Sequence, residues 1–205
     1  MELDENRPLE EELLPEFDVS DTVARAVDAE PPAAWEALLG VDLIELGRRR
    51  PLIGALGAVR GAPEILQRLL RGQGLPSRPD SLTLRSMADS KDAAVGDWVL
   101  LGERPGRALA LGLVGRFWKP VIEYRRVPPD AFADFDELGW AKTVYSLSAE
   151  PIGGGRTQLR GTMRTTTTDA GARRRFARYW TYGVGSGAHV LVAALLDVAR
   201  SRAEA

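Results

Sequence analysis

The sequence predicts an α+β fold in which a succession of antiparallel strands precedes one long C-terminal helix. Between residues 81 and 168, short segments alternate with turn signals, which is typical of strands that pair in succession. From about Asp169 to Ala203, apolar residues recur every three or four positions, which predicts a helix with one apolar face. Parallel pairs would need long crossover connections, so this order favours an antiparallel sheet.

The first eighteen residues differ from the rest of the chain in composition. They carry eight acidic residues against one basic residue, Arg7, and are interrupted by Pro8 and Pro15. Such a charge run is typical of a solvated segment. We therefore expect residues 1–18 to form a mobile acidic arm and residues 19–205 to form a single domain.

The domain is expected to open with a strand followed by two short helices. Residues 22–28 alternate in polarity, which predicts the strand. Residues 30–40 begin with prolines and end on a glycine, as a short helix does. Residues 52–70 are also helical in pattern, as one or two helices, because Pro63 and two glycines interrupt them. Residues 71–80 are expected to form a loop.

The middle of the chain is expected to supply six further strands. The last two are joined by Pro151–Gly155, a glycine-rich connection that predicts a hairpin. The six segments are residues 81–87, 98–103, 107–118, 121–127, 141–149 and 157–168.

The C-terminal helix is expected to bend in its middle. Asp169 is a suitable N-cap residue for it. Gly183, Gly185 and Gly187 each weaken a helix by about 1 kcal/mol relative to alanine. A glycine-rich phosphate loop is not expected here, because that loop needs a preceding strand and a following helix N-terminus.

Composition excludes several classes of chemistry. The chain has no cysteine, so disulfides, thiolate nucleophiles, iron–sulfur clusters and cysteine-based zinc sites are excluded. Its one histidine, His189, cannot form a multi-histidine metal site. With 27 basic and 29 acidic residues, the net charge of −2 gives no global positive field for nucleic acid. We expect no metal, no cofactor and no nucleic-acid partner.

The start of the chain and its hydropathy predict a cytoplasmic protein without a transmembrane segment. The first residues are acidic, whereas a secretory signal begins with basic residues. The uninterrupted apolar stretches are far shorter than the roughly 20 residues that a spanning helix needs. The oligomeric state is left open.

Four stretches together resemble the START-like, or SRPBCC, superfamily of helix-grip proteins, which includes plant pollen allergens and polyketide cyclases. No single motif carries the resemblance; the order of the elements and these stretches do, over about residues 20–203. The stretches are Val27–Leu38, Leu111–Trp118, Gly139–Lys142, and Thr162–Thr165 followed by Ala172–Trp180.

The resemblance implies a curved antiparallel sheet of about seven strands wrapped around the C-terminal helix, with a cavity between them. Members use this cavity to hold lipids, sterols or polyketides, and some perform chemistry on them. The resemblance therefore implies a hydrophobic small-molecule ligand, such as a lipid or a polyketide-like compound. Because the chain has no cysteine and one histidine for nucleophile–base chemistry, we expect this ligand to be bound without catalysis. The alternative is a polyketide cyclase, aromatase or dehydratase that uses the same cavity.

Candidate ligand-binding residues are apolar and aromatic side chains on the predicted sheet and helix. They could equally be ordinary core residues. For an enzyme, His189 and Tyr145 are the candidate catalytic residues, although no partner acid for His189 is identifiable near it. The ligand-binding candidates are Trp118, Tyr124, Tyr145, Met163, Phe176 and Trp180.

Arginines gather at the predicted start of the C-terminal helix, where they oppose the helix dipole. From Arg156 onward, nine arginines face three acidic residues, a net charge of +6. They could bind an anion or an acidic partner, which is a third candidate function, or pair with the acidic arm. They could also be solvated side chains. The candidate patch consists of Arg160, Arg164, Arg173, Arg174, Arg175 and Arg178.

Overall fold

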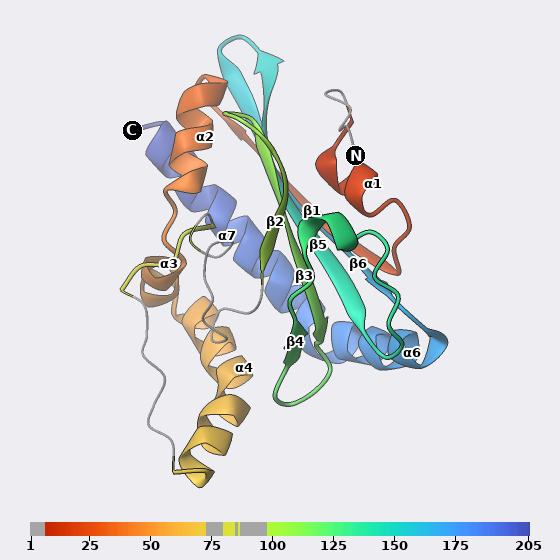
Figure 1. The fold of residues 1–205 in the computed structure, drawn as a ribbon. Helices are drawn as coiled ribbons and strands as arrows, with labels where there is room; N and C mark the ends of the chain where they lie inside the picture. The colour runs from red at the N-terminus through yellow and green to blue at the C-terminus, as the bar shows by residue number, and fades with distance from the viewer. Residues whose placement is uncertain (1–6, 73–79, 85, 87–97) are drawn as a thin grey trace.

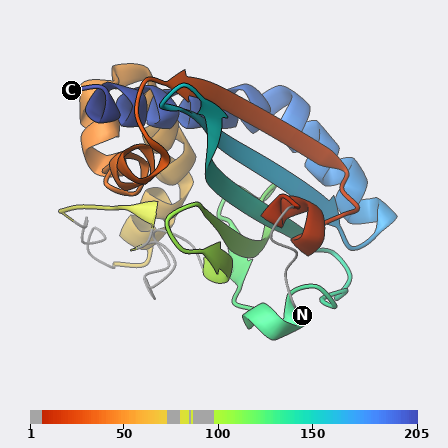
Figure 2. The same cartoon turned by 90° about the horizontal axis from the view of Figure 1, so that it is seen from above.

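The computed structural model of the chain describes residues 7–72, 80–84, 86 and 98–205, and its centre is a curved antiparallel sheet (Figure 1). The strand order is β1-β6-β5-β3-β2, and β4 pairs with β3 off this path. A C-terminal helix, α7, crosses one face of the sheet, and a short N-terminal helix, α1, lies on the other (Figure 2). The predicted fold class is confirmed.

The strands pair in an antiparallel sheet, as predicted. Every adjacent pair is antiparallel, and β5 and β6 form a long hairpin that turns at Gly154 and Gly155. Both glycines have a positive φ, which other residues rarely adopt. The strands are β1 (Val19–Val27), β2 (Val99–Arg104), β3 (Ala108–Arg116), β4 (Glu123–Arg125), β5 (Ala141–Gly153) and β6 (Arg156–Thr167).

The sheet has six strands rather than about seven, because the strand predicted at residues 81–87 is absent from its described part. Residues 81–83 have no regular structure, and Leu84 and Ser86 are helical. Thr83 and Ser86 exchange hydrogen bonds between side chains and backbone N–H groups at 2.8 and 3.3 Å, which caps a helix start. Residues 85 and 87 lie outside the described residues.

Within the described residues from β1 to Gly72, the structure has three helices where two were expected: α2 (Pro31–Leu39), α3 (Leu43–Arg49) and α4 (Pro51–Leu70). The third arises because Asp42 caps α3, its carboxylate accepting hydrogen bonds from the N–H groups of Ile44 and Glu45 at 2.8 and 3.3 Å. Helix α4 is one continuous helix across Pro63.

The C-terminal helical stretch is bent by 62° in its middle, as its glycines predict. It consists of α6 (Ala170–Tyr179), a π-helical turn η3 (Trp180–Val184) and α7 (Gly185–Ala203). The predicted N-cap is confirmed: Asp169 accepts hydrogen bonds from the N–H groups of Ala172 and Gly171, and these bonds, that from Ala172 above all, lower the pKa of its carboxyl. No single described helix is long and apolar enough to cross a membrane, and only the bent pair α6–α7 reaches that length and composition when taken together.

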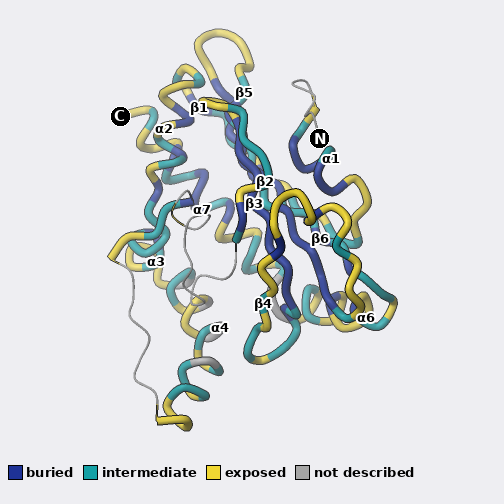
Figure 3. Tube along the Cα trace, in the orientation of Figure 1, coloured by how far each residue is buried: buried dark blue, intermediate teal, exposed yellow. Residues whose placement is uncertain are grey.

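The two faces of the sheet carry different hydrophobic cores, and Figure 3 shows the buried strands between them. On the first face, α2 and α7 pack over β1, β3, β5 and β6, and this core includes Trp35, Leu38, Leu147 and Leu195. On the second face, the residues of α1 (Leu9–Leu13) pack with those of β3, β5 and the segment before β5.

The N-terminal segment therefore differs from the mobile arm that its composition suggests. Leu9, Leu13 and Leu14 are buried, and Glu10 is only 6% exposed because it accepts a hydrogen bond from Ser146 Oγ at 2.6 Å. In this structure residues 9–14 lie against the sheet.

Candidate functional site

An open groove lies between strand β1 and the bend of the C-terminal helix. Its volume is about 440 Å³. That volume falls in the range of small-molecule pockets, roughly 300–1,000 Å³. We call it the elbow groove; it is lined by Ser20, Asp21, Trp180, Thr181, Gly185, Ser186, His189 and Val190.

The π-helical turn places the tryptophan of the elbow groove. A π turn widens a helix locally and occurs frequently at functional sites. A Cβ atom at Gly185 would lie 2.9 Å from the carbonyl oxygen of Trp180 and 3.0 Å from two atoms of its indole. The indole therefore occupies its position because residue 185 is a glycine.

Four of the six predicted ligand-binding residues meet in one aromatic cluster behind the groove. Phe176 is buried at its centre, where it stacks on Trp180 with ring centroids 6.0 Å apart and meets Phe117 edge-on at 6.3 Å. Trp118 and Tyr124 are half-buried and pack against the same cluster. Trp180 thus belongs both to this aromatic cluster and to the wall of the elbow groove.

The other two predicted residues lie on the sheet face that α7 covers. In the strand register, Asp21 stands opposite Met163, and Met163 stands opposite Tyr145. Residues that stand opposite one another point to the same face, so Tyr145, Met163 and the groove residue Asp21 form one row. Burial raises the pKa of Tyr145, so its hydroxyl stays protonated at any ordinary pH.

His189 has an acidic partner, which the sequence did not reveal. Its Nδ1 atom lies 3.0 and 3.2 Å from the two carboxylate oxygens of Asp21. Asp21 is 168 positions away in the chain, so no local spacing could identify it. The pair is held at the rim of the elbow groove because β1 is the strand beside α7.

The space between the sheet and the middle of α7 is closely packed. A Cβ atom at Gly161 of β6 would lie 2.7 Å from Val192 Cγ1 and 3.2 Å from Leu147 Cδ2. The predicted cavity between sheet and helix is therefore not open at this point. Besides the elbow groove, the described residues line a second open groove near the end of α7, of about 400 Å³, with Leu46, Arg49, Arg50, Asp197, Val198, Ser201, Arg202 and Ala205 in its wall.

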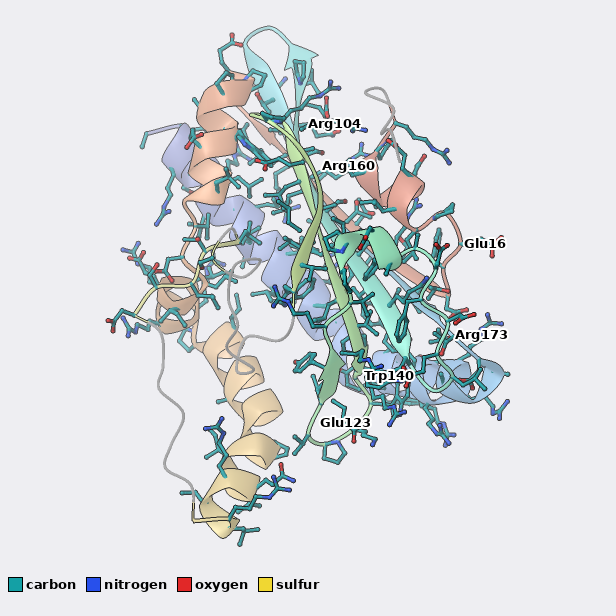
Figure 4. All side chains as sticks on the ribbon, viewed as in Figure 1. Glu16, Arg104, Glu123, Trp140, Arg160 and Arg173 are labelled. Carbon is teal, nitrogen blue, oxygen red and sulfur yellow. The ribbon has the colours of Figure 1, made fainter. Side chains whose placement is uncertain are left out.

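The candidate arginine patch is divided between two surfaces. Arg160 and Arg164 lie on β6 and Arg173 lies on α6; Figure 4 shows Arg160 and Arg173 on these separate elements. The guanidinium of Arg160 donates a hydrogen bond to the side-chain oxygen of Gln158 at 3.3 Å. Arg174, Arg175 and Arg178 continue along α6 and are exposed.

Arg164 and Arg173 contact the acidic segment in the same chain. Arg164 is 14% exposed, and its guanidinium lies 3.6 Å from Glu11 and 4.7 Å from the centre of the Phe17 ring. Arg173 pairs with Asp18 at 2.7 Å. These contacts match the alternative in which the acidic segment pairs with the arginines, and they leave Arg164 poorly placed to meet an external anion.

No metal centre is visible in the part of the chain that the structure describes, since no three His, Asp or Glu side chains gather there as metal ligands. The groups that can act chemically at the elbow groove are therefore an imidazole, its carboxylate partner and hydroxyl side chains. Such groups can hydrogen-bond a polar substituent or move a proton.

Comparison with known proteins gives likenesses in structure alone. No family model matches the sequence, and no curated protein does. Among solved structures, the chain is similar to the Mll3558 protein from Rhizobium loti, with a TM-score of 0.41 and 14% identity over 88% of this chain and 96% of that one. It is also similar to the Zhui aromatase/cyclase from Streptomyces sp. R1128, with a TM-score of 0.32 and 13% identity over 91% and 93% of the two chains.

A third likeness is to PFC0360w, an HSP90 activator from Plasmodium falciparum, with a TM-score of 0.30 and 11% identity over 85% of this chain and 96% of that one. At these scores and identities the likenesses assign no activity. The strand order and the position of α7 decide the architecture. The chain has a helix-grip fold. This is the fold that the resemblance of the four sequence stretches implies.

Proposed function

We propose that this helix-grip protein binds a hydrophobic small molecule, lipid or polyketide-like, at the elbow groove and does not transform it. One observation carries the proposal: Trp180 lines the groove and also stacks on the aromatic cluster behind it. A ligand seated on Trp180 would therefore rest on an indole that is held in place by its stack on the buried Phe176.

The groove combines an apolar wall with polar side chains, which fits a ligand with an apolar body and a polar end. Small-molecule sites combine apolar side chains with polar groups that fix orientation. Here Trp180 and Val190 supply apolar wall, whereas Ser20, Asp21, Thr181, Ser186 and His189 supply polar groups. A hydroxyl or carbonyl group of the ligand would be oriented by the His189–Asp21 pair.

The site is proposed to extend inward from the groove towards Tyr145 and Met163. Both lie in the same row as Asp21. Widening this path requires the bent segment to shift, and its π-helical turn is the part of the helix with irregular backbone bonds. The proposed binding takes place in the cytoplasm, and no cofactor takes part.

Ligand extraction tests the proposal first. The purified protein is denatured, extracted into organic solvent and analysed by mass spectrometry. We expect a lipid or polyketide-like compound in a near-stoichiometric amount. The extracted protein, after refolding, is then titrated with 1-anilinonaphthalene-8-sulfonate, a fluorescent probe with an apolar ring system and one polar group.

Substitutions at the elbow distinguish this site from unspecific adsorption. Trp180→Ala should weaken probe binding at least tenfold, because it removes the shared wall of groove and cluster. Tyr182→Ala is the matched control: this tyrosine lies in the same π-helical turn but is 86% exposed, and its loss should change affinity less than twofold. Equal affinities in all three proteins would contradict the proposal.

A cyclase-type enzyme is the second candidate, and the His189–Asp21 contact favours it. A carboxylate that holds an imidazole fixes its orientation and tautomer and stabilises the protonated ring, which suits a general base. Tyr145, kept protonated by burial, would serve as a hydrogen-bond donor to a carbonyl. Proton removal next to a carbonyl is the chemistry that these groups could support.

Proton exchange into a β-diketone in D₂O, followed by NMR, tests this second candidate. General-base catalysis typically contributes about 10²–10⁴-fold. His189→Gln should therefore abolish any protein-dependent exchange, and Tyr145→Phe should reduce it at least tenfold. Asp21→Asn should also slow it, through loss of the imidazole's orientation. Exchange that persists unchanged in His189→Gln and Tyr145→Phe would rule out these assignments.

A further inference from the structure

The outward side of helix α4 is a continuous apolar stripe. Its members are exposed and recur at steps of three or four positions, so they share one face of the helix. We call this face the α4 stripe; it consists of Pro51, Ala55, Ala58, Ala62, Leu66 and Leu69. Neighbouring Leu70 is exposed as well.

Helix α4 is anchored at its start and projects from the body towards its end (Figure 1). Near its start, Ile53 packs against the main core, and Gly54 lies so close to Gly47 that a Cβ atom would be 2.7 Å from the Gly47 carbonyl oxygen. Near its end, Leu66, Leu69 and Leu70 are 57%, 55% and 80% exposed. Grouped exposed leucines of this kind mark an interaction surface.

The segment that carries the stripe is strongly basic, although the whole chain is slightly acidic. Residues 48–71 contain six arginines and one glutamate, a net charge of +5, against −2 for all 205 residues. Arg48 and Arg50 are exposed beside the first turn of α4, and Arg71 is exposed directly after its last turn. The apolar stripe thus has basic side chains at both ends.

We infer that α4 docks on the surface of a lipid bilayer that carries anionic headgroups. An amphipathic helix binds such a surface by burying its apolar face at the level of the acyl chains while basic residues meet the headgroups. The α4 stripe has small alanines in its first half and leucines in its second. The leucine end therefore inserts more deeply than the alanine end.

A second copy of the chain fits the stripe less well than a bilayer does. Stable protein interfaces engage about 20–30 residues on each side. The α4 stripe and Leu70 supply seven exposed residues, and the high positive charge of residues 48–71 would repel the same segment of a second copy. Binding to a bilayer requires only one apolar helix face, and the anionic headgroups attract the positive charge of residues 48–71. This inference goes beyond the proposed ligand binding and does not depend on it.

Vesicle co-sedimentation of the full chain tests the inference. Vesicles of phosphatidylcholine alone are compared with vesicles containing 30% phosphatidylglycerol. We expect at least tenfold stronger binding to the anionic vesicles, and a marked loss of binding as salt rises from 0.05 to 0.5 M. Replacing Leu66, Leu69 and Leu70 by serine together should weaken binding at least tenfold. Leu138→Ser, at a leucine that is 73% exposed elsewhere on the surface, should change it less than twofold.

A site-specific dye reports which residues enter the bilayer. Because the chain has no cysteine, Leu70→Cys and Leu138→Cys each accept one environment-sensitive fluorophore. Emission from position 70 should shift to the blue with anionic vesicles, and emission from position 138 should not. The inference is overturned by equal behaviour at the two positions, or by binding that ignores the triple serine substitution. A wild-type dimer that the triple substitution converts to a monomer in light scattering would also overturn it, because the stripe would then belong to a second copy.

Discussion

Leu9→Ala asks whether the N-terminal segment is part of the folded protein or a mobile arm. Leu9 is 2% exposed and packs in the core on the second face of the sheet, with Leu13, Val144 and Phe132. If the segment is docked as the structure shows, the substitution leaves a hole in a packed layer. If the segment is mobile, Leu9 is exposed in both the folded and the unfolded state, and the substitution leaves the free energy of unfolding unchanged.

The size of the effect follows from burial. Replacing a buried leucine by alanine costs about 2–5 kcal/mol. Helix α1 has only five residues, so it can undock instead of enclosing a hole, and the cost cannot exceed the free energy of docking the segment. We therefore expect a loss of about 2–4 kcal/mol, which lowers Tm by roughly 4–16 °C for a chain of this size.

Urea unfolding followed by circular dichroism measures this loss. Leu138→Ala is the matched control, because its side chain is 73% exposed, and we expect it to change the free energy of unfolding by less than about 0.5 kcal/mol. Deleting residues 1–16 removes the docked segment together with Leu9. The free energy of unfolding lost by this deletion is therefore the upper limit for the loss in Leu9→Ala. A loss for Leu9→Ala no larger than that of Leu138→Ala would refute the docked arrangement and favour the mobile arm.

Three other substitutions test the packing on the two faces of the sheet and at the elbow groove. Gly161→Ala should destabilise the protein by about 1–3 kcal/mol in urea, since its Cβ would lie 2.7 Å from Val192 Cγ1, and Val192→Ala in the same chain should recover part of that loss. Gly185→Ala should push the Trp180 indole from its position and weaken probe binding at the elbow groove while the far-UV spectrum stays unchanged. Burial lowers the pKa of Lys142 in the folded protein below its ordinary value of 10.5. Between these two pKa values the unfolded state binds more protons than the folded state, so the free energy of unfolding rises with pH. The wild type should therefore gain stability relative to Lys142→Met as pH rises from 8 towards 10.5; a constant difference would contradict the burial.

The parts of the fold that the sequence predicts are those that periodicity encodes. Strands β3, β5 and β6 and the apolar face of the C-terminal stretch repeat their patterns over nine or more residues. Helix α1 escaped prediction because Glu10, Glu11 and Glu12 interrupt a pattern whose apolar members, Leu9 and Leu13, are only two. A run of charged residues predicts a solvated segment unless the partners of those charges are known.

Those partners come from distant parts of the chain, and local patterns do not contain them. Glu12 meets Arg104 at 2.8 Å, 92 positions away, and His189 meets Asp21 across 168 positions. The His189–Asp21 contact becomes visible only when β1 packs beside α7, and the Glu12–Arg104 contact only when α1 packs on the second face of the sheet. The aromatic cluster contains four of the six ligand-binding candidates, Trp118, Tyr124, Phe176 and Trp180, and their binding of a ligand stays a prediction.

The distribution of acidic and basic residues supports the docking of α4 on an anionic bilayer. Three acids of the segment at the start of the chain contact arginines from distant elements: Glu11 lies 3.6 Å from Arg164, Glu12 lies 2.8 Å from Arg104, and Asp18 lies 2.7 Å from Arg173. These three acids are thereby paired with arginines of the second face and of α6. They lie on the side of the sheet away from α7, whereas α4 packs beside α7. Those acids therefore do not neutralise residues 48–71, whose exposed Arg48, Arg50 and Arg71 accompany exposed leucines, and a surface that offers both negative charge and an apolar interior suits this segment.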